Sequence, residues 1–160
     1  MNSEVYFEKI YNENYQKVFG LCLGYVKGNS ALAKDLVQDV FVKVWLNLKS
    51  FRKDANPSTW IYRITVNTCL QELRKKEHLS LDFDIEAEKT KETTTQKENS
   101  LTRMYACINQ LSLQNQSIIL LELDEVPQAE IAEIIGVSHQ VVRTRIHRIK
   151  TQLSKCVKND

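Results

Sequence analysis

Apolar side chains return at three- and four-residue steps along most of this 160-residue chain. The pattern runs from Phe7 to Val26 and resumes from Leu32 to Leu48. This period lines one side of an α-helix with apolar groups, whereas a half-buried strand would show them at every second residue. Because the chain holds only 4 Gly and 2 Pro, it also has few residues for the tight turns of a many-stranded fold. The sequence therefore predicts an all-α fold.

Polar and glycine residues mark where the helices of the first block begin and end. Gly28–Asn29–Ser30 interrupts the periodic run, and we expect Ser30 to cap the second helix. Asn56 followed by Pro57 predicts the start of a third helix, because an asparagine cap and a proline in the first turn are both favoured there. That helix ends in the basic run Arg74–Lys75–Lys76.

Residues 77–99 break the helical period. The segment is acidic and rich in Thr, Lys and Glu, a composition typical of a flexible linker. We therefore expect two small helical domains, 1–76 and 100–160, joined by this linker. In the second domain the expected boundaries are a helix from Leu101, a cap at Ser112, a helix from Gln128 to Ile135 begun by Pro127 and ended by Gly136, and a cap at Ser138 for the last helix.

Several classes of protein are excluded by composition. No apolar run approaches the ~20 residues that a membrane span needs, and the N-terminus lacks the basic-then-apolar order of a signal peptide. We therefore expect a cytoplasmic protein with no direct membrane insertion. No two of the four cysteines have zinc or redox spacing, so we predict free thiols in a reducing compartment, with no metal and no cofactor. The cysteines are Cys22, Cys69, Cys107 and Cys156.

The positive charge of the chain gathers at its end. The net charge is only +2, yet residues 139–160 carry six bases and one acid. Residues 101–138 carry the opposite balance, one base and five acids. A solvated helix face usually interleaves the two signs, so this cluster indicates a polyanionic partner.

The basic cluster follows the pattern of a helix-turn-helix. Ala132 allows two helices to approach closely, Gly136 supplies a left-handed turn, and Val142 closes the core between them. The alternative is a helical hairpin whose basic face is merely solvated, with Arg145 packed against the domain. The side-chain types on the second helix suit the major groove and the phosphates of DNA. The candidate DNA-binding residues are Ser138, His139, Gln140, Arg143, Thr144, Arg145, His147 and Arg148.

The third expected helix interleaves aromatic and basic side chains. Trp60 and Tyr62 stand beside Arg63 and Asn67, upstream of the basic run Arg74–Lys76. Aromatic rings next to cations suit single-stranded nucleic acid, where stacking of one base contributes ~1–3 kcal/mol. The alternative is that Trp60 belongs to the core and that the basic end complements the helix dipole.

Three stretches in order resemble the sigma-70 superfamily, and specifically its small extracytoplasmic-function (group 4) factors. DLVQDVFVKVW over Asp35–Trp45 is similar to the region 2.2 helix, which binds the clamp coiled coil of the largest RNA polymerase subunit. TWIYRITVNTCLQELRKK over Thr59–Lys76 is similar to regions 2.3 and 2.4, which melt and read the −10 element. PQAEIAEIIGVSHQVVRTRIHRIKTQL over Pro127–Leu153 is similar to region 4.2, which reads the −35 element.

The resemblance implies a role for each stretch. Residues 1–76 are expected to be sigma region 2, residues 100–160 sigma region 4, and residues 77–99 the linker between them. The residues implied for core-polymerase binding are Asp35, Gln38, Asp39, Val42 and Trp45. The residues implied for the −10 element are Arg52, Lys53, Asn56, Ser58, Thr59, Trp60, Tyr62, Arg63, Asn67, Arg74, Lys75 and Lys76, and those for the −35 element are the eight of the helix-turn-helix.

These expectations describe a transcription initiation factor and not an enzyme, since no nucleophile–base pair, metal cluster or phosphate loop is evident. The implied partners are core RNA polymerase, through its clamp coiled coil and flap, promoter DNA and an anti-sigma factor. Two alternatives stay open: Asp35 and Asp39 as solvated acids with Trp45 in the core, and a stand-alone helix-turn-helix regulator that acts without polymerase. A pure interaction protein, such as a sigma-like decoy or an RNA-binding module, is a third.

Overall fold

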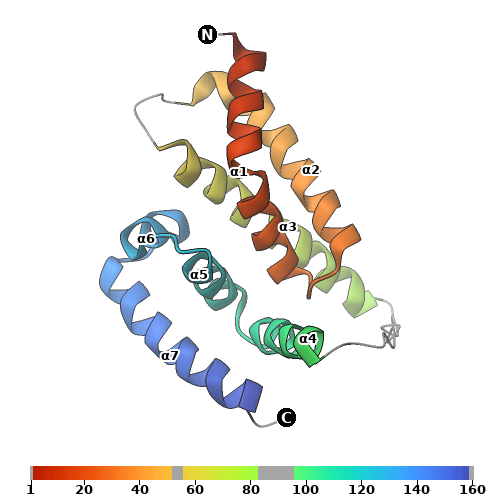
Figure 1. Ribbon diagram of the computed structural model, residues 1–160, viewed down its shortest axis with the longest axis vertical. Coiled ribbons are helices and arrows are strands. Elements are labelled where there is room, and N and C mark those ends of the chain that lie inside the picture. The colour runs from red at the N-terminus through yellow and green to blue at the C-terminus, as the bar shows by residue number, and fades with distance from the viewer. Residues whose placement is uncertain (1, 52–55, 83–95, 159–160) are drawn as a thin grey trace.

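The computed structural model describes residues 2–51, 56–82 and 96–158. Within these ranges the chain forms α-helices and one 3₁₀ turn, with no strand, so the predicted all-α fold is confirmed. The helices form two groups that meet along one side (Figure 1). The elements are α1 (Ser3–Tyr25), α2 (Ser30–Asn47), η1 (Leu48–Ser50), α3 (Pro57–Asp82), α4 (Gln96–Asn109), α5 (Leu113–Leu123), α6 (Gln128–Ile135) and α7 (His139–Lys158).

Side-chain caps begin these helices largely where the sequence predicts them. The Asn56 side chain accepts a hydrogen bond from the Ser58 amide at 3.0 Å, and Pro57 is the first residue of α3. Ser112 caps α5 in the same way. The prediction for Ser30 was wrong, because Asn29 caps α2 and accepts from the Leu32 amide at 3.1 Å. Asparagine in the preceding position already supplies the oxygen that the helix end needs.

The turn between α6 and α7 has the geometry that a helix-turn-helix requires. Gly136 lies in the left-handed region with φ of 84°, and its amide donates to the Ala132 carbonyl at 2.8 Å. Ser138 then accepts a hydrogen bond from the Val141 amide at 3.2 Å and caps α7. Glycine suits this turn because a Cβ is disfavoured at positive φ.

The helices beside the expected linker are longer than the sequence indicates. α3 continues to Asp82 and α4 begins at Gln96, so both ends of the segment 77–99 are helical backbone. The periodic apolar pattern stops earlier because these turns carry few apolar residues. The central part, 83–95, lies outside the described residues.

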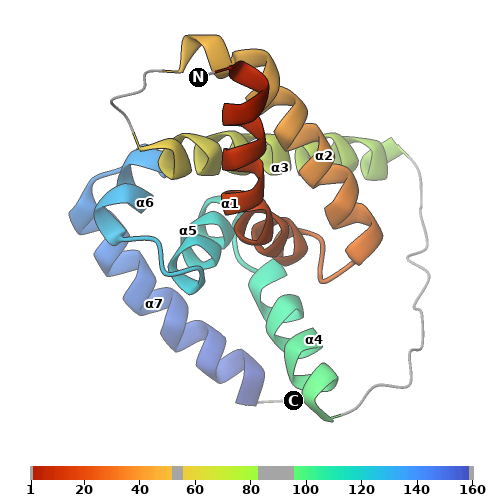
Figure 2. The ribbon, with the colours of Figure 1, turned by 45° about the horizontal axis from the view of Figure 1, so that its top comes forward.

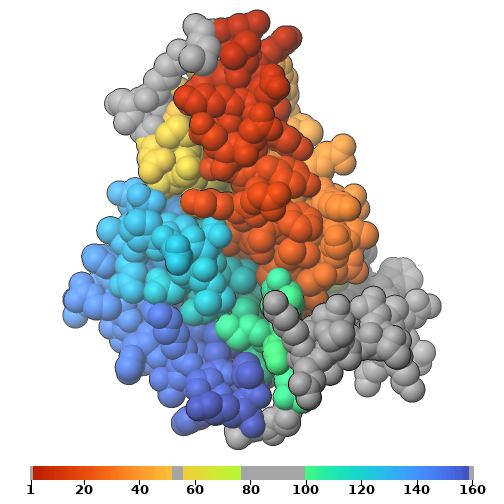
Figure 3. Space-filling view, viewed as in Figure 1, coloured from red at the N-terminus to blue at the C-terminus, as the bar shows by residue number. Residues whose placement is uncertain are grey.

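The two helical groups pack against each other. α1 lies between α2 and α3 on one side and meets α4 and α5 on the other, while α3 meets α6 (Figure 2). The buried apolar residues of both groups form one continuous cluster, which includes Tyr25 of α1 and Leu120 of α5. In the space-filling view the first group lies directly against the α5–α6 surface (Figure 3).

A glycine on α1 permits the closest approach between the groups. A Cβ placed on Gly24 would overlap the Leu120 side chain of α5. The Gly24 carbonyl also accepts a hydrogen bond from the Asn109 side chain of α4 at 3.1 Å. Next to it, the Tyr25 hydroxyl is hydrogen-bonded to the Ser117 hydroxyl of α5. One helical turn of α1 therefore touches two helices of the second group.

The four cysteines form two spatial pairs, and only one pair has free thiols. Cys22 and Cys69 are free and buried, with their sulfurs 3.8 Å apart. Cys107 and Cys156 are joined by a disulfide that links α4 to α7. The prediction of free thiols was therefore wrong for this pair. The two positions are 49 residues apart and meet only because α4 packs on α7, so no local spacing could indicate the bond.

Among the described residues, no helix combines the length and the apolar character that a membrane span demands.

Substitution of Gly24 is expected to separate the two helical groups. In Gly24→Leu the new side chain must displace Leu120, and overpacking of this kind typically destabilises by about 1–3 kcal/mol. We expect a lower melting temperature and a larger radius of gyration in small-angle X-ray scattering. Gly20→Leu is the matched control, because a Cβ on Gly20 meets nothing within 4 Å. Unchanged scattering in Gly24→Leu would contradict this account of the joint.

Candidate nucleic-acid and polymerase interface

One face of α2 is polar at its centre and apolar at its end. Each residue predicted to bind a polymerase has another of the set three or four positions away, which places them on one side of the helix. All five are exposed, while the opposite side of α2 is buried in the core. Val42 is 52% exposed and Trp45 44% exposed, so the alternative of a core tryptophan is disfavoured. The residues of this α2 face are Asp35, Gln38, Asp39, Val42 and Trp45.

Aromatic residues of α1 extend this face into a groove. Phe7 packs edge-on against Trp45, with ring centroids 5.3 Å apart, and Tyr11 packs against Phe41 at 4.6 Å. Together with Tyr15 these rings line a hollow beside the α2 face. The sequence reasoning assigned no role to the α1 rings. Their four-residue spacing indicates that they share one face of α1, and this spacing is visible in the sequence.

The start of α3 holds predicted −10 residues in different settings. Ser58 donates to the Asn14 side chain of α1 at 3.1 Å, and that asparagine is buried. Trp60 is half-buried and stacks on Phe51, with ring centroids 4.6 Å apart. Asn56 is exposed at the helix cap. Two further predicted residues, Arg52 and Lys53, lie outside the described residues.

Three of the predicted −10 residues contact the acidic segment of the second group. The Tyr62 hydroxyl donates to Asp124 at 3.1 Å. The Thr59 hydroxyl donates to Glu130 at 3.3 Å. Arg63 follows one turn later. Its guanidinium donates to the main-chain carbonyl of residue 133 at 3.2 Å. The α5–α6 segment therefore lies over this face of α3, and only 3% of the Tyr62 surface is exposed to solvent.

The remaining predicted residues of α3 are free of this cover. Asn67 and the basic run Arg74–Lys76 are exposed. They continue along the same helix, away from its contact with α6 (Figure 2). Near the start of α3, Thr59, Tyr62 and Arg63 thus contact the second group, although Arg63 stays exposed, whereas the predicted −10 residues toward the end of the helix are exposed and make no such contact.

Burial sets the protonation of the Tyr62–Asp124 pair within this contact. Burial raises the pKa of the Asp124 carboxyl above its ordinary value, and the hydrogen bond from Tyr62 offsets part of this rise. Burial and the neighbouring Asp124 charge both raise the pKa of the Tyr62 phenol. The phenol therefore remains the proton donor to the carboxylate over the neutral pH range.

The predicted DNA-binding face of α7 is open to solvent. Val142, Ile146 and Ile149 bury the opposite side of the helix. Arg145 is half-buried and donates to the Gln114 side chain of α5, as the packing alternative proposed for this residue. Ser138 caps the helix. The exposed residues of this α7 face are His139, Gln140, Arg143, Thr144, His147 and Arg148.

The site can bind polyanions and protein surfaces. The α7 face presents guanidinium, imidazole, amide and hydroxyl groups, the donor types that contact phosphates and base edges. Within the described ranges, no three His, Cys, Asp or Glu side chains come close enough together to hold a metal ion.

Both halves of the chain match family models. Residues 10–78 match the model described as Sigma-70 region 2, and residues 101–153 match the model described as Sigma-70, region 4. RNA polymerase sigma factor YlaC of Bacillus subtilis is 31% identical over 92% of this chain and 90% of its own length. ECF RNA polymerase sigma factor SigW of the same organism is 28% identical over 95% of this chain and 84% of its own.

Two solved structures share the whole fold. The structure of CnrH in complex with the cytosolic domain of CnrY has a TM-score of 0.74 at 21% identity, over 96% of this chain and 88% of that one. The sigma factor RpoE of Bartonella quintana, in complex with the anti-sigma factor NepR, has a TM-score of 0.72 at 21% identity, over 96% and 99%. Because both matches span α1 to α7, the packing of the two helical groups belongs to the shared fold.

The raised pKa of Asp124 makes the contact between the groups sensitive to pH. A carboxyl whose pKa is higher in the packed state stabilises that state below its ordinary pKa of about 3.9, and this contribution is lost as the pH rises through the raised value. We expect Asp124→Asn to remove this part of the pH dependence, because the amide oxygen can still accept from Tyr62. Melting temperatures of the variant and wild type between pH 4 and 7 would measure it.

Glu13→Gln, an exposed change on α1, is the control and should melt with the wild-type pH profile. Identical pH profiles for Asp124→Asn and the wild type would show that this carboxyl does not govern the contact.

Proposed function

The chain belongs to the extracytoplasmic-function branch of the sigma-70 family, and on that premise we propose that it directs core RNA polymerase to specific promoters. It acts inside the cell as an alternative sigma factor, and its contribution to initiation is binding, with no catalytic step of its own. The observation that carries the proposal is the pair of open faces on one chain, the mixed polar and apolar α2 face and the basic α7 face.

The two helical groups are assigned separate tasks. Residues 1–76 act as sigma region 2 and residues 100–160 as sigma region 4, with 77–99 between them. The family models support this division, because their matches end and begin at residues 78 and 101. The helical ends of the 77–99 segment, up to Asp82 and from Gln96, extend each domain into the connection.

The α2 face is the proposed contact with core polymerase. Asp35 and Asp39 offer carboxylates to arginines on a partner helix, and such charge-assisted pairs are the stronger class of hydrogen bond. Trp45 and Val42 add exposed apolar area at the end of the face, and large aromatics are frequent anchors of protein interfaces. The α1 rings in the adjoining groove widen the apolar part of the contact.

The α7 face is the proposed reader of the −35 element. Its N-terminal residues, from Ser138 to Gln140, approach the DNA with the positive end of the helix dipole. Arg143, Arg148 and His147 follow along the exposed side, where they reach phosphates and bases of the major groove. Arg145 keeps its bond to Gln114 and orients the helix in the closed molecule.

The start of α3 is the proposed −10 site, and it is covered in this arrangement. Thr59, Tyr62 and Arg63 are engaged by α5–α6, so region 4 must move away before they meet the melted strand. We assign this opening to the assembly with core polymerase. The sigma factor RpoE shares this fold while bound to the anti-sigma factor NepR, which supports an anti-sigma factor as the partner that holds this chain closed.

A stand-alone helix-turn-helix regulator is the rival function. Such a protein needs only the α7 face, whereas this chain matches sigma factors across both halves. The comparisons therefore favour the sigma factor.

Loss of one carboxylate on the α2 face is expected to abolish polymerase binding. Asp39→Ala should fail to co-elute with bacterial core RNA polymerase on gel filtration, because a contact of this kind typically weakens by about 2–5 kcal/mol when one partner is removed. Glu13→Ala removes an exposed acid from α1 and should co-elute like the wild type. A folded wild-type chain that does not co-elute would sink the sigma-factor proposal in favour of the regulator.

Loss of one arginine on the α7 face is expected to weaken −35 recognition. In holoenzyme assembled with Arg143→Ala, the binding free energy for promoter DNA should weaken by about 1–3 kcal/mol if the side chain reads a base. If it contacts a phosphate, the logarithm of the binding constant should instead depend less steeply on the logarithm of the salt concentration, with a slope about 1 smaller in size. Lys155→Ala, an exposed change near the end of the same helix, is the control. Equal affinities and equal salt slopes for both variants would contradict the assignment of the α7 face.

A further inference from the structure

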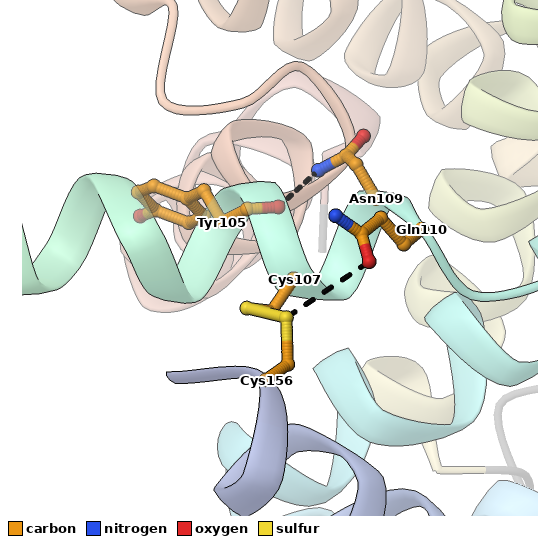
Figure 4. Close-up of a disulfide and its surroundings, with 5 residues drawn as sticks. All are labelled: Tyr105, Cys107, Asn109, Gln110 and Cys156. Atoms are coloured by element: carbon orange, nitrogen blue, oxygen red, sulfur yellow. Dashed lines mark hydrogen bonds between the residues drawn. A yellow bond between two sulfur atoms is a disulfide. The ribbon is translucent and has the colours of Figure 1, made fainter. Parts of the chain in front are cut away.

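The bond between Cys107 and Cys156 joins two helices that have different tasks. Figure 4 shows it between the end of α4 and the last turns of α7, beside Gln110. α7 carries the proposed −35 face. α4 touches the first domain through Asn109, and its Tyr105 side chain lies against Gly28. The disulfide thus connects the DNA-reading helix to a helix of the joint between domains.

The two sulfurs of this bond differ in accessibility. Cys107 is buried, with 3% of its surface exposed, whereas Cys156 is half-buried. A small reagent therefore reaches the bond at Cys156. Cys22 and Cys69 are both fully buried, so the same reagent does not reach the other pair.

The second domain has a core that does not depend on the bond. Ile108 of α4 is buried together with Ile149 and Leu153 of α7 in the common apolar cluster. α7 also packs on α5 and α6. Both helices therefore keep their places when the sulfurs are separate, and the chain can exist in an oxidised and a reduced folded form.

We propose that Cys107 and Cys156 form a reversible thiol–disulfide switch, closed by hydrogen peroxide and opened by a dithiol reductant. The Cys156 thiolate attacks a peroxide oxygen, so that an S–O bond forms, the O–O bond breaks and water leaves after protonation. The Cys107 thiol then attacks the Cys156 sulfenic acid. The S–S bond forms, the S–O bond breaks and a second water leaves.

Electrons balance over this sequence, because the two thiols lose two electrons and the peroxide gains two. For reopening, one thiolate of the reductant attacks the Cys156 sulfur and Cys107 leaves as thiolate. The second thiol of the reductant then attacks the reductant sulfur that is bonded to Cys156. This step forms the oxidised reductant and releases the Cys156 thiol. Because Cys156 is half-buried, it is the sulfur that both the peroxide and the reductant reach.

The switch controls how the domains separate, and this consequence rests on the proposed function. In the reduced chain only side-chain packing holds α4 on α7, so the end of α4 can open locally from α1 while α5 to α7 stay in contact. In the oxidised chain α4 is tied to α7, so the contacts of α1 with α4 and α5 and of α3 with α6 have to break together. Linked contacts hold more strongly than separate ones because, once one contact has formed, the cross-link raises the effective concentration for the other. Oxidation therefore favours the closed arrangement, in which the proposed −10 face of α3 is covered.

The chemical step is tested on the full chain alone. After complete reduction and removal of the reductant, equimolar hydrogen peroxide should lower the intact mass by two hydrogen atoms, and peptide mapping should find residue 107 linked to residue 156. In Cys107→Ala the reaction should stop at the Cys156 sulfenic acid, which dimedone traps. Cys22→Ser should form the bond like the wild type. Stable thiols at both positions, or a dimedone adduct on wild-type Cys107, would overturn the switch.

The consequence is tested by hydrogen exchange with no polymerase or DNA present. Closing the bond should slow exchange in α4 and in the last turn of α1 by about tenfold or more, since local opening is suppressed. Cys156→Ser should exchange like the reduced wild type with or without peroxide. Equal exchange in the oxidised and reduced wild type would overturn the coupling. Failure to bind core polymerase would leave both results intact and count only against the proposed function.

Discussion

The close contact of α1 with α5 is the constraint on which the arrangement of the molecule depends. Gly24 leaves room for Leu120, and the neighbouring Tyr25 reaches Ser117, so the first domain can approach the second without a void. This approach brings α3 and α6 together as well. Because close-packed interfaces deform little, a wider residue at the glycine position must displace the Leu120 side chain and strain the contact between the groups.

The same side chains serve two surfaces that exclude each other. Tyr62 and Thr59 hydrogen-bond to acids of α5–α6 in the closed molecule, and they belong to the stretch proposed to read the melted −10 strand. A carboxylate offers to a hydroxyl the same kind of acceptor oxygen that a phosphate offers. On the proposed function, acids of residues 101–138 therefore take the place of DNA on α3, while the basic α7 face remains outside the contact.

Local signals predicted the helices, and long-range pairs escaped prediction. Asn56, Ser112 and Gly136 act on backbone groups within a few residues, so their roles can be read from sequence order. The basic α7 face follows from helical spacing in the same way. The disulfide partners and the Tyr62–Asp124 pair are 49 and 62 residues apart. Their contact depends on how whole helices pack, which a period of apolar residues does not specify.

The hydrogen bonds that cover the start of α3 are a modest part of the closed state, beside the apolar cluster that the two groups share. The three hydrogen bonds from α3 to the α5–α6 segment contribute about 0.5–1.5 kcal/mol each when measured against water. Binding with nanomolar affinity releases about 12 kcal/mol, so a partner that engages only the open form can invert the equilibrium. The α2 face lies outside the joint and is available in the closed molecule. On the proposed function, polymerase therefore docks there first, and the proposed −10 face of α3 is uncovered in a second step.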